Sequence, residues 1–198
     1  MKSDIISALA GTYALLNVTV ITQNGTALLD EAYGAAPVGH LTYTPEGWMS
    51  ATITATEPEW RPLDLTFPAQ PNQTDAEWAA VGKQYVDRPN LKFFSIFPIC
   101  HPLSQTLQAC ADSTLLTPSL LCYAGPLSVS DAIPASNVSG QVIHGPLDVA
   151  TIPAWVGTSQ LRNYTVFEDA DGETLLRITS PRPTGTANLW WRKLPSRL

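Results

Sequence analysis

Arg162 stands directly before an N-glycosylation acceptor pattern, Asn163-Tyr164-Thr165. In a β-strand, neighbouring side chains point to opposite faces, so Arg162 and Asn163 cannot both face water. A glycan of many sugars does not fit inside a barrel, and a glycosylated Asn163 therefore places Arg162 and Tyr164 on the inner face. An inward guanidinium or phenol can donate hydrogen bonds to a carbonyl or enolate oxygen. Arg162 and Tyr164 are thus candidate catalytic residues.

The sequence leaves three interpretations of Arg162 open. A buried guanidinium is costly and does not lose its proton, so an inward Arg162 needs a partner. It is then either structural, pairing with a buried carboxylate or with backbone carbonyl groups, or it donates to a bound ligand. In the third interpretation Asn163 carries no glycan and Arg162 faces water. The same alternation turns the apolar side chains of Leu161 and Phe167 outward. This is unfavourable unless the outer side of the strand is covered, or unless its inner side lines a cavity that needs the charge of Arg162.

Other candidates follow from strand alternation and side-chain chemistry. His144 is a possible donor or base, or else a structural histidine with satisfied hydrogen bonds. Trp190 and Trp191 alternate faces, so one ring should reach the interior, and we assign Trp190 to the ligand. Each aliphatic or aromatic candidate could equally be ordinary core. The candidate substrate-binding residues are Tyr43, Trp48, Met49, Tyr123 and Trp190.

The familiar catalytic motifs are missing from the sequence. It contains no Gly-x-Ser-x-Gly, phosphate loop, dinucleotide fingerprint, His-x-His or Cys-x-x-Cys, and its three histidines are isolated. Hydrolase, kinase, dehydrogenase and metalloenzyme functions are therefore disfavoured. We expect no metal and no cofactor.

Composition describes one globular domain. The chain has 198 residues, of which 44% are hydrophobic and 14% charged, and no apolar run approaches the about 20 residues of a membrane span. The formal charge of −6, with 11 scattered basic residues, disfavours nucleic acid as a partner. A hydrophobic small molecule is the favoured partner, and the oligomeric state is left open.

Asparagine usage predicts a secreted glycoprotein. Five of the seven asparagines begin Asn-x-Ser/Thr patterns, although coincidence in a threonine-rich chain is the alternative. "MKSDIISALAG" does not read as a leader, so we expect a native signal peptide to have been removed. The predicted glycosylation sites are Asn17, Asn24, Asn72, Asn137 and Asn163.

Three cysteines, Cys100, Cys110 and Cys122, suit an oxidising compartment. They predict one disulfide and one leftover thiol, or alternatively three buried thiols. The spacing does not identify the pair.

Short alternating strands dominate the rest of the chain. Asn24-Gly25 and Pro45-Glu46-Gly47 are turn signals between such strands. The pattern predicts an all-β antiparallel sandwich or barrel of at least six or seven strands. The strand-bearing ranges are 13–22, 39–56, 160–181 and 187–194.

One helix and one insertion interrupt the strands. Thr74 and Glu77 form a capping box ahead of an apolar stripe, which predicts a helix over 74–86 lying against the sheet. Residues 87–120 are apolar, rich in proline and irregular, which indicates a long packed insertion.

Asn17 orients the first strand by the same argument as Asn163. If Asn17 carries a glycan, it faces outward together with Thr19. Leu16, Val18 and Val20 are then expected to face inward, as their apolar side chains favour.

Several short motifs together resemble a known family. They are, in chain order, "LAGTYALLN" (9–17), "VGHLTYTPEGWMSA" (38–51), the capped helix, "CYAGPLSV" (122–129), "WVGTSQLRNYTV" (155–166) and "LWWRKL" (189–194). This series resembles the lipocalin-like domain family of bacteria and fungi. The resemblance implies a single domain over 9–194, an antiparallel lipocalin-like β-barrel with one or two helices and a long insertion at about 87–120.

The resemblance also implies a function. Some fungal proteins of this kind are pericyclases, and the glycosylated type resembles hetero-Diels–Alderases that join a tropolone-derived quinone methide to a sesquiterpene alkene. A cofactor-free pericyclase of fungal secondary metabolism is therefore one hypothesis. A non-catalytic carrier of a hydrophobic small molecule is the alternative, and a structural domain with a filled core is a third.

Overall fold

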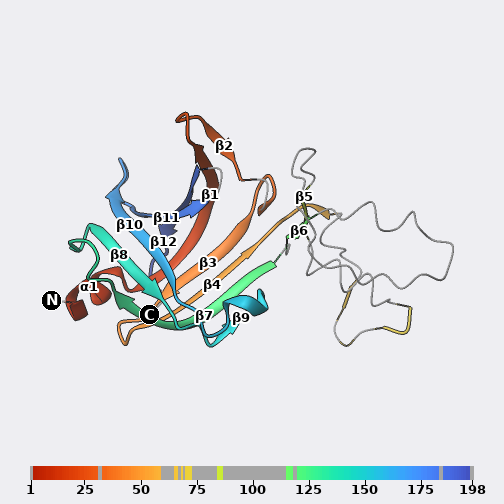
Figure 1. The fold of residues 1–198 in the computed structure, drawn as a ribbon, viewed down its shortest axis with the longest axis horizontal. Helices are drawn as coiled ribbons and strands as arrows, with labels where there is room; N and C mark the ends of the chain where they lie inside the picture. The colour runs from red at the N-terminus through yellow and green to blue at the C-terminus, as the bar shows by residue number, and fades with distance from the viewer. Residues whose placement is uncertain are drawn as a thin grey trace, which may run out of the picture.

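The computed structural model describes residues 2–30, 33–58, 65–66, 68, 70–72, 84–86, 115–117, 120–182 and 185–196. Eight antiparallel strands form a closed barrel, since the first of them also pairs with the last (Figure 1). Closure leaves no free edge in the barrel wall. The strands, in their order around the wall, are β1 (Gly11–Thr22), β3 (Val38–Tyr43), β4 (Trp48–Thr54), β7 (Leu120–Val129), β8 (Ser139–His144), β10 (Gln160–Glu168), β11 (Thr174–Arg182) and β12 (Gly185–Lys193).

Shorter elements are added to this barrel. β2 (Ala27–Leu29) pairs with β1, and β9 (Val149–Ala150) pairs with β7. The turn η3 (Pro153–Trp155) follows β9. A separate pair consists of β5 (Gln84–Val86) and β6 (Leu115–Thr117).

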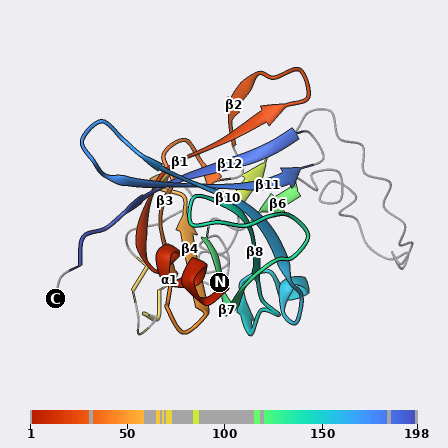
Figure 2. The same ribbon diagram turned by 90° about the vertical axis from the view of Figure 1, so that its left-hand side faces the viewer.

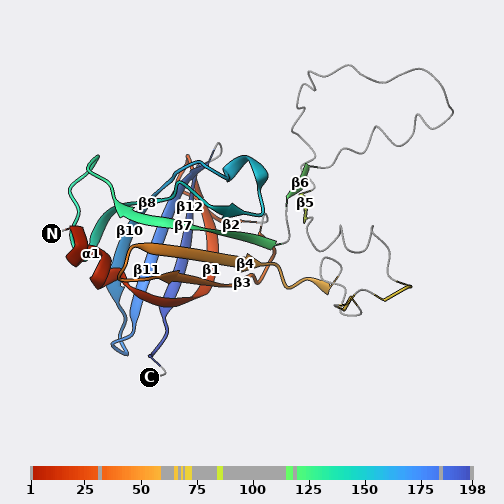
Figure 3. The same ribbon diagram turned by 90° about the horizontal axis from the view of Figure 1, so that it is seen from below.

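The predicted hairpins are confirmed where local turn residues define them. Gly25 and Gly47 both adopt a φ of +83°, a conformation that glycine reaches without steric cost. In the second turn the Thr44 amide donates to the Trp48 carbonyl at 2.9 Å, which joins β3 to β4. Strands β3, β4 and β7 then run side by side along one wall (Figure 3).

A β-bulge at Leu16 makes one strand prediction wrong. Leu15 pairs with Trp191 and Asn17 with Trp190, so β12 offers no partner to Leu16. The extra residue breaks the alternation, and Leu16 faces outward with 43% of its surface exposed. Val18 is fully buried, as predicted.

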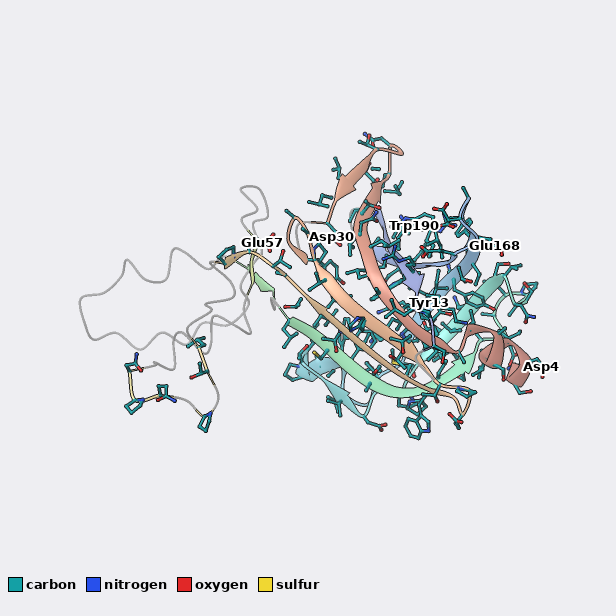
Figure 4. The ribbon with its side chains drawn as sticks, turned by 180° about the vertical axis from the view of Figure 1, so that it is seen from behind. Asp4, Tyr13, Asp30, Glu57, Glu168 and Trp190 are labelled. Atoms are coloured by element: carbon teal, nitrogen blue, oxygen red, sulfur yellow. The ribbon has the colours of Figure 1, made fainter. Side chains whose placement is uncertain are left out.

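Helix α1 (Lys2–Leu9) covers one end of the barrel (Figure 2). The sequence analysis did not predict it. Ile5 and Leu9 are buried in the main apolar cluster, and the Tyr13 hydroxyl donates to the Leu9 carbonyl at 2.7 Å. In Figure 4 Tyr13 lies toward α1, whereas Asp30 and Glu57 lie toward the opposite end, which we call the mouth.

The helix predicted over 74–86 does not extend to its expected end. Residues 84–86 form strand β5, whose partner is β6. Residues 74–83, and most of the predicted insertion at 87–120, lie outside the described residues. Within the described ranges, no helix has the length and apolar character needed to cross a membrane.

Cys122 carries a free, half-buried thiol. Cys100 and Cys110 lie outside the described residues. The predicted disulfide stays a prediction, and the free thiol of Cys122 is compatible with both arrangements that the sequence left open, one disulfide with a leftover thiol or three thiols.

The acceptor asparagines lie on the surface. In β1 and β10 the exposed Asn17 and Asn163 face outward, and the exposed Leu161 shares the outer face of Asn163. The orientation deduced for β10 is therefore confirmed, and so is that of Asn17 and Val18 in β1, whereas Leu16 is the exception at the bulge. Glycosylation of Asn17 and Asn163 stays a prediction. All five acceptors are exposed: Asn17, Asn24, Asn72, Asn137 and Asn163.

Candidate functional site

A cavity of about 200 Å³ lies inside the barrel at the mouth, opposite α1. Strand ends form its wall, and residues of η3 and of the β2–β3 connection complete it. The barrel interior is thus not packed solid by its own side chains. The lining residues are Tyr33, Leu41, Ile53, Leu121, Tyr123, His144, Trp155, Gln160, Arg162, Ile178, Ser180, Pro181, Leu189 and Trp191.

Apolar and aromatic side chains dominate this lining. Among the described lining residues, Arg162 is the one with a formal charge at neutral pH, and no aspartate or glutamate is present. The cavity therefore combines an apolar wall with a single cation. This is the usual character of a small-molecule site, in which a few polar groups fix the orientation of an apolar ligand.

Arg162 faces the cavity from β10. Its neighbours on the strand, Leu161 and Asn163, are exposed on the other face, so the predicted alternation is confirmed. Nη1 donates to the Leu161 carbonyl at 2.8 Å, and Nη2 makes a long hydrogen bond of 3.4 Å to Oε1 of Gln160. Within the described ranges no carboxylate forms an ion pair with Arg162. The sequence analysis proposed a buried carboxylate or a backbone carbonyl as the structural partner of Arg162. Among the described residues, Arg162 has a carbonyl partner and no carboxylate partner.

Tyr123 lines the cavity beside Arg162. Burial raises the pKa of the Tyr123 phenol, and the charge of the nearby Arg162 partly offsets that rise. The Tyr123 ring packs edge-on against Trp155, with ring centroids 5.6 Å apart. Tyr123 therefore presents a neutral phenol at neutral pH.

His144 also lines the cavity, and it is buried. A hydrogen bond of 2.8 Å joins its Nε2 to the Tyr43 hydroxyl. Burial, reinforced by the charge of Arg162, lowers the pKa of His144 to about 3. Nδ1 has no hydrogen-bond partner among the described residues. The imidazole is thus neutral near pH 7, which suits hydrogen bonding better than proton transfer.

Tyr43 supports the site from behind His144. It is 1% exposed and is absent from the described lining. Burial raises the pKa of Tyr43 well above its usual range, and the nearby Tyr123 and Tyr13 phenols add to the rise. Its ring packs edge-on against Tyr13 and His144. Tyr43 therefore positions His144 and does not contact the cavity itself.

Three predicted site residues lie elsewhere. The Tyr164 hydroxyl donates to the Ser136 carbonyl, and the side chain is buried away from the lining. Met49 is buried near the β3–β4 turn, at the α1 end of β4, below the cavity. Trp48 is 52% exposed beside the same turn, far from the mouth. Tyr164 and Met49 face inward and Trp48 lies beside the turn. All three lie at a different level along the barrel axis from the cavity and are absent from its described lining.

The assignment of the two tryptophans is reversed. Trp191, 2% exposed, lines the cavity, whereas Trp190 lies on the outer face of β12. There Trp190 and Phe167 pack together with ring centroids 5.3 Å apart, and the Arg177 guanidinium lies over both rings. Phe167, which β10 turns outward, is therefore packed against Trp190, whereas Leu161 on the same face stays 52% exposed.

The sequence analysis missed several lining residues. Gln160 shares the face of Arg162 two positions away, and Ser180 similarly shares the face of Ile178, so alternation alone could have found them. Tyr33 and Trp155 come from connections between strands, which carry no such signal.

Glu57 holds the connection that bears Tyr33. Its carboxylate accepts hydrogen bonds from the backbone amides of Ala35 and Thr56. A side chain at Gly34, where φ is +82°, would collide with this carboxylate. Tyr33 therefore lies on a short connection fixed at the mouth.

No metal site is evident in the described part of the chain. It holds no group of three histidine, cysteine, aspartate or glutamate side chains arranged to ligate an ion. The lining of the cavity consists of hydrogen-bond donors and apolar surfaces instead.

The comparisons with known proteins agree with this architecture. The sequence model of the lipocalin-like domain family matches residues 10–87 and 102–194. The chain therefore belongs to the lipocalin-like domain family. A search of curated proteins found no match, and neither did a search of solved structures.

Proposed function

We propose that this barrel binds one compact, largely apolar, ring-bearing small molecule in the mouth cavity. The observation that carries the proposal is the sheltered volume of about 200 Å³, lined by apolar and aromatic side chains and one cation. An apolar cavity of about 150 Å³ can bind benzene, and drug-sized ligands need about 300 Å³ or more. One or two small rings thus match the space.

Ligand titration tests this binding. A panel of neutral, anionic and cationic one-ring and two-ring compounds would be titrated into the protein, with tryptophan fluorescence and calorimetry as readouts. Trp155 and Trp191 line the cavity and would report occupancy. An Ile178→Phe variant adds bulk to the lining and should lose binding, which would show that the ligand binds inside the cavity. No binding by any member of the panel would overturn the proposal.

A second candidate function is the cofactor-free hetero-Diels–Alder reaction. The position of Arg162 favours it, because a guanidinium in a sheltered cavity can donate to the carbonyl oxygen of a quinone methide as negative charge shifts onto that oxygen. The four-atom enone and the alkene form two new bonds, and every atom of both reactants stays in the product. Such a reaction needs orientation above all, which can lower a bimolecular barrier by about 7–11 kcal/mol.

The volume sets a condition on this second function. A cavity of about 200 Å³ holds the ring-bearing reactant alone. A sesquiterpene alkene would then have to bind above it, at the mouth, near Tyr33 and Trp155. The binding function carries no such condition and is the one that the geometry favours.

Product analysis separates the two functions. A quinone methide generated in solution would be mixed with a humulene-type alkene, with and without protein, and product rate and enantiomeric excess measured. Catalysis predicts a faster, chirally biased reaction that slows in an Arg162→Met variant. A racemic product formed at the background rate would exclude catalysis and would favour the carrier function.

We also propose that the protein passes through a secretory pathway and carries N-linked glycans. The exposure of all five acceptor asparagines supports this, since each is accessible to modification. Expression through a eukaryotic secretory route, followed by intact mass before and after glycosidase treatment, tests it. An unchanged mass would contradict the proposal.

A further inference from the structure

The positive charge of Arg162 has no negative partner in the described part of the chain. In the described part of the chain, its guanidinium donates hydrogen bonds to two neutral groups, the Leu161 carbonyl and the Gln160 amide oxygen. Arg162 is half-buried. A partly desolvated cation without a counter-charge is less favourable than a paired one, and arginine does not relieve this by losing a proton. The site therefore lacks a negative charge that a ligand could supply.

The titratable neighbours do not supply it either. Burial raises the pKa values of Tyr123 and Tyr43, so both phenols stay neutral at neutral pH. His144 is also neutral, because burial lowers its pKa. The described lining thus carries one positive charge, although the whole chain has a net charge of −6.

Arg162 also has donors to spare. A guanidinium carries five N–H groups on both of its edges, more than the acceptors at Leu161 and Gln160 occupy. Its planar fork matches the two oxygens of a carboxylate, which is the geometry of the strongest arginine pairs.

We infer that the ligand of the mouth cavity is a compact aromatic carboxylate, with its ring among the apolar wall and its carboxylate on Arg162. This inference rests on the proposed binding function and adds the charge of the ligand to it. The ring would lie near Trp191, Ile178 and Leu189, which line the same cavity.

Two probes of equal size test the charge. Cinnamate and cinnamamide have the same shape and number of non-hydrogen atoms, and differ in charge. Calorimetric titration near neutral pH should show cinnamate binding about tenfold to a hundredfold more tightly than cinnamamide, the range expected for a charge-assisted hydrogen bond in a sheltered site.

Arginine variants assign the preference to one side chain. Arg162→Met should weaken cinnamate far more than cinnamamide, so that the difference between the two probes disappears. Arg177→Met is the matched control, because Arg177 lies on the neighbouring strand but on the outer face, and it should keep the full preference. Arg162→Lys retains the charge without the fork and should keep a reduced preference. Circular dichroism and urea denaturation verify folding of each variant.

The possible outcomes separate this inference from the binding function. Equal affinity of the two probes, or an undiminished preference in a folded Arg162→Met variant, would overturn the anionic ligand and leave the binding function intact. If neither probe binds, and no compound of the neutral, anionic and cationic panel binds, the binding function is overturned as well. A preference for cinnamate that disappears in Arg162→Met, is reduced in Arg162→Lys and is kept in Arg177→Met would support the inference.

Discussion

The Tyr43 hydroxyl and Nε2 of His144 lie 2.8 Å apart inside the barrel, although 101 residues separate them in the chain. Strands β4 and β7 lie between their strands in the sheet. This hydrogen bond joins the wall of the cavity to the core beneath it. It therefore links the stability of the barrel to the geometry of the site.

Removing one partner of this pair should destabilise the barrel more than removing both. Tyr43→Phe leaves Nε2 of His144 buried without a partner, which should lower the free energy of unfolding by about 1–3 kcal/mol. A Tyr43→Phe, His144→Leu double variant leaves no orphaned group from this bond and should recover part of that loss. Urea denaturation of the two single variants and the double variant gives the coupling. Strictly additive losses would show that the bond contributes little.

Stability should fall as the solution becomes acidic, because His144 is buried in its neutral form. Its folded pKa is about 3, against 6.5 for an ordinary histidine, so the unfolded chain binds the proton more tightly. The stabilisation is complete above about pH 6.5 and is lost progressively as pH falls toward about 3, with a slope of at most about 1.4 kcal/mol per pH unit.

Denaturation at about pH 7 and about pH 5 measures this dependence. The double variant without His144 should show a shallower loss than the native chain. His40→Gln, at an exposed position, is the matched control and should keep the native slope. Equal slopes in the native chain and the double variant would exclude His144 as the source.

The two neighbouring tryptophans should differ in their effect on binding. Trp191→Phe reduces the aromatic wall of the cavity and should weaken a bound aromatic ligand about threefold to tenfold. Trp190→Phe changes only the outer cluster with Arg177 and should leave affinity unchanged. Fluorescence titration with the tightest compound of the panel compares them. Equal losses in both variants would contradict the inward assignment of Trp191.

Glu57 should affect ligand affinity without contacting the ligand. Glu57→Ala removes the acceptor of the Ala35 and Thr56 amides, so the connection bearing Tyr33 should loosen. We expect a loss of about 1 kcal/mol in stability and a weaker ligand complex. Glu173→Ala, which breaks only an exposed pair with Arg192, is the control and should leave affinity unchanged. Unaltered affinity in Glu57→Ala would show that Tyr33 holds its place without this support.

Local signals in the sequence predicted much of the barrel. The turns at Asn24-Gly25 and Pro45-Glu46-Gly47 are encoded by a few adjacent residues, and both hairpins are confirmed. The orientation of Arg162 also followed from its neighbour, because Asn163 marks the outer face and alternation determines the rest.

The remaining errors needed information that no short segment contains. Strand alternation predicts that Trp190 and Trp191 face opposite sides of the sheet. Which of the two faces the interior depends on how β12 pairs with β1 and β11. The bulge at Leu16 likewise exists only in relation to β12. Height along the barrel, which separates Met49 from the cavity, depends on the stagger of all the strands.

In the part of the chain that the structure describes, helix α1 covers one end of the closed wall and the cavity lies at the other end, the mouth. With the far end covered by α1, the proposed ligand would enter and leave by the mouth, so a competitor would not displace it from behind. One ligand would then have to dissociate before the next one binds. The rate of exchange would depend on the dissociation rate of the bound ligand and not on the concentration of the competitor.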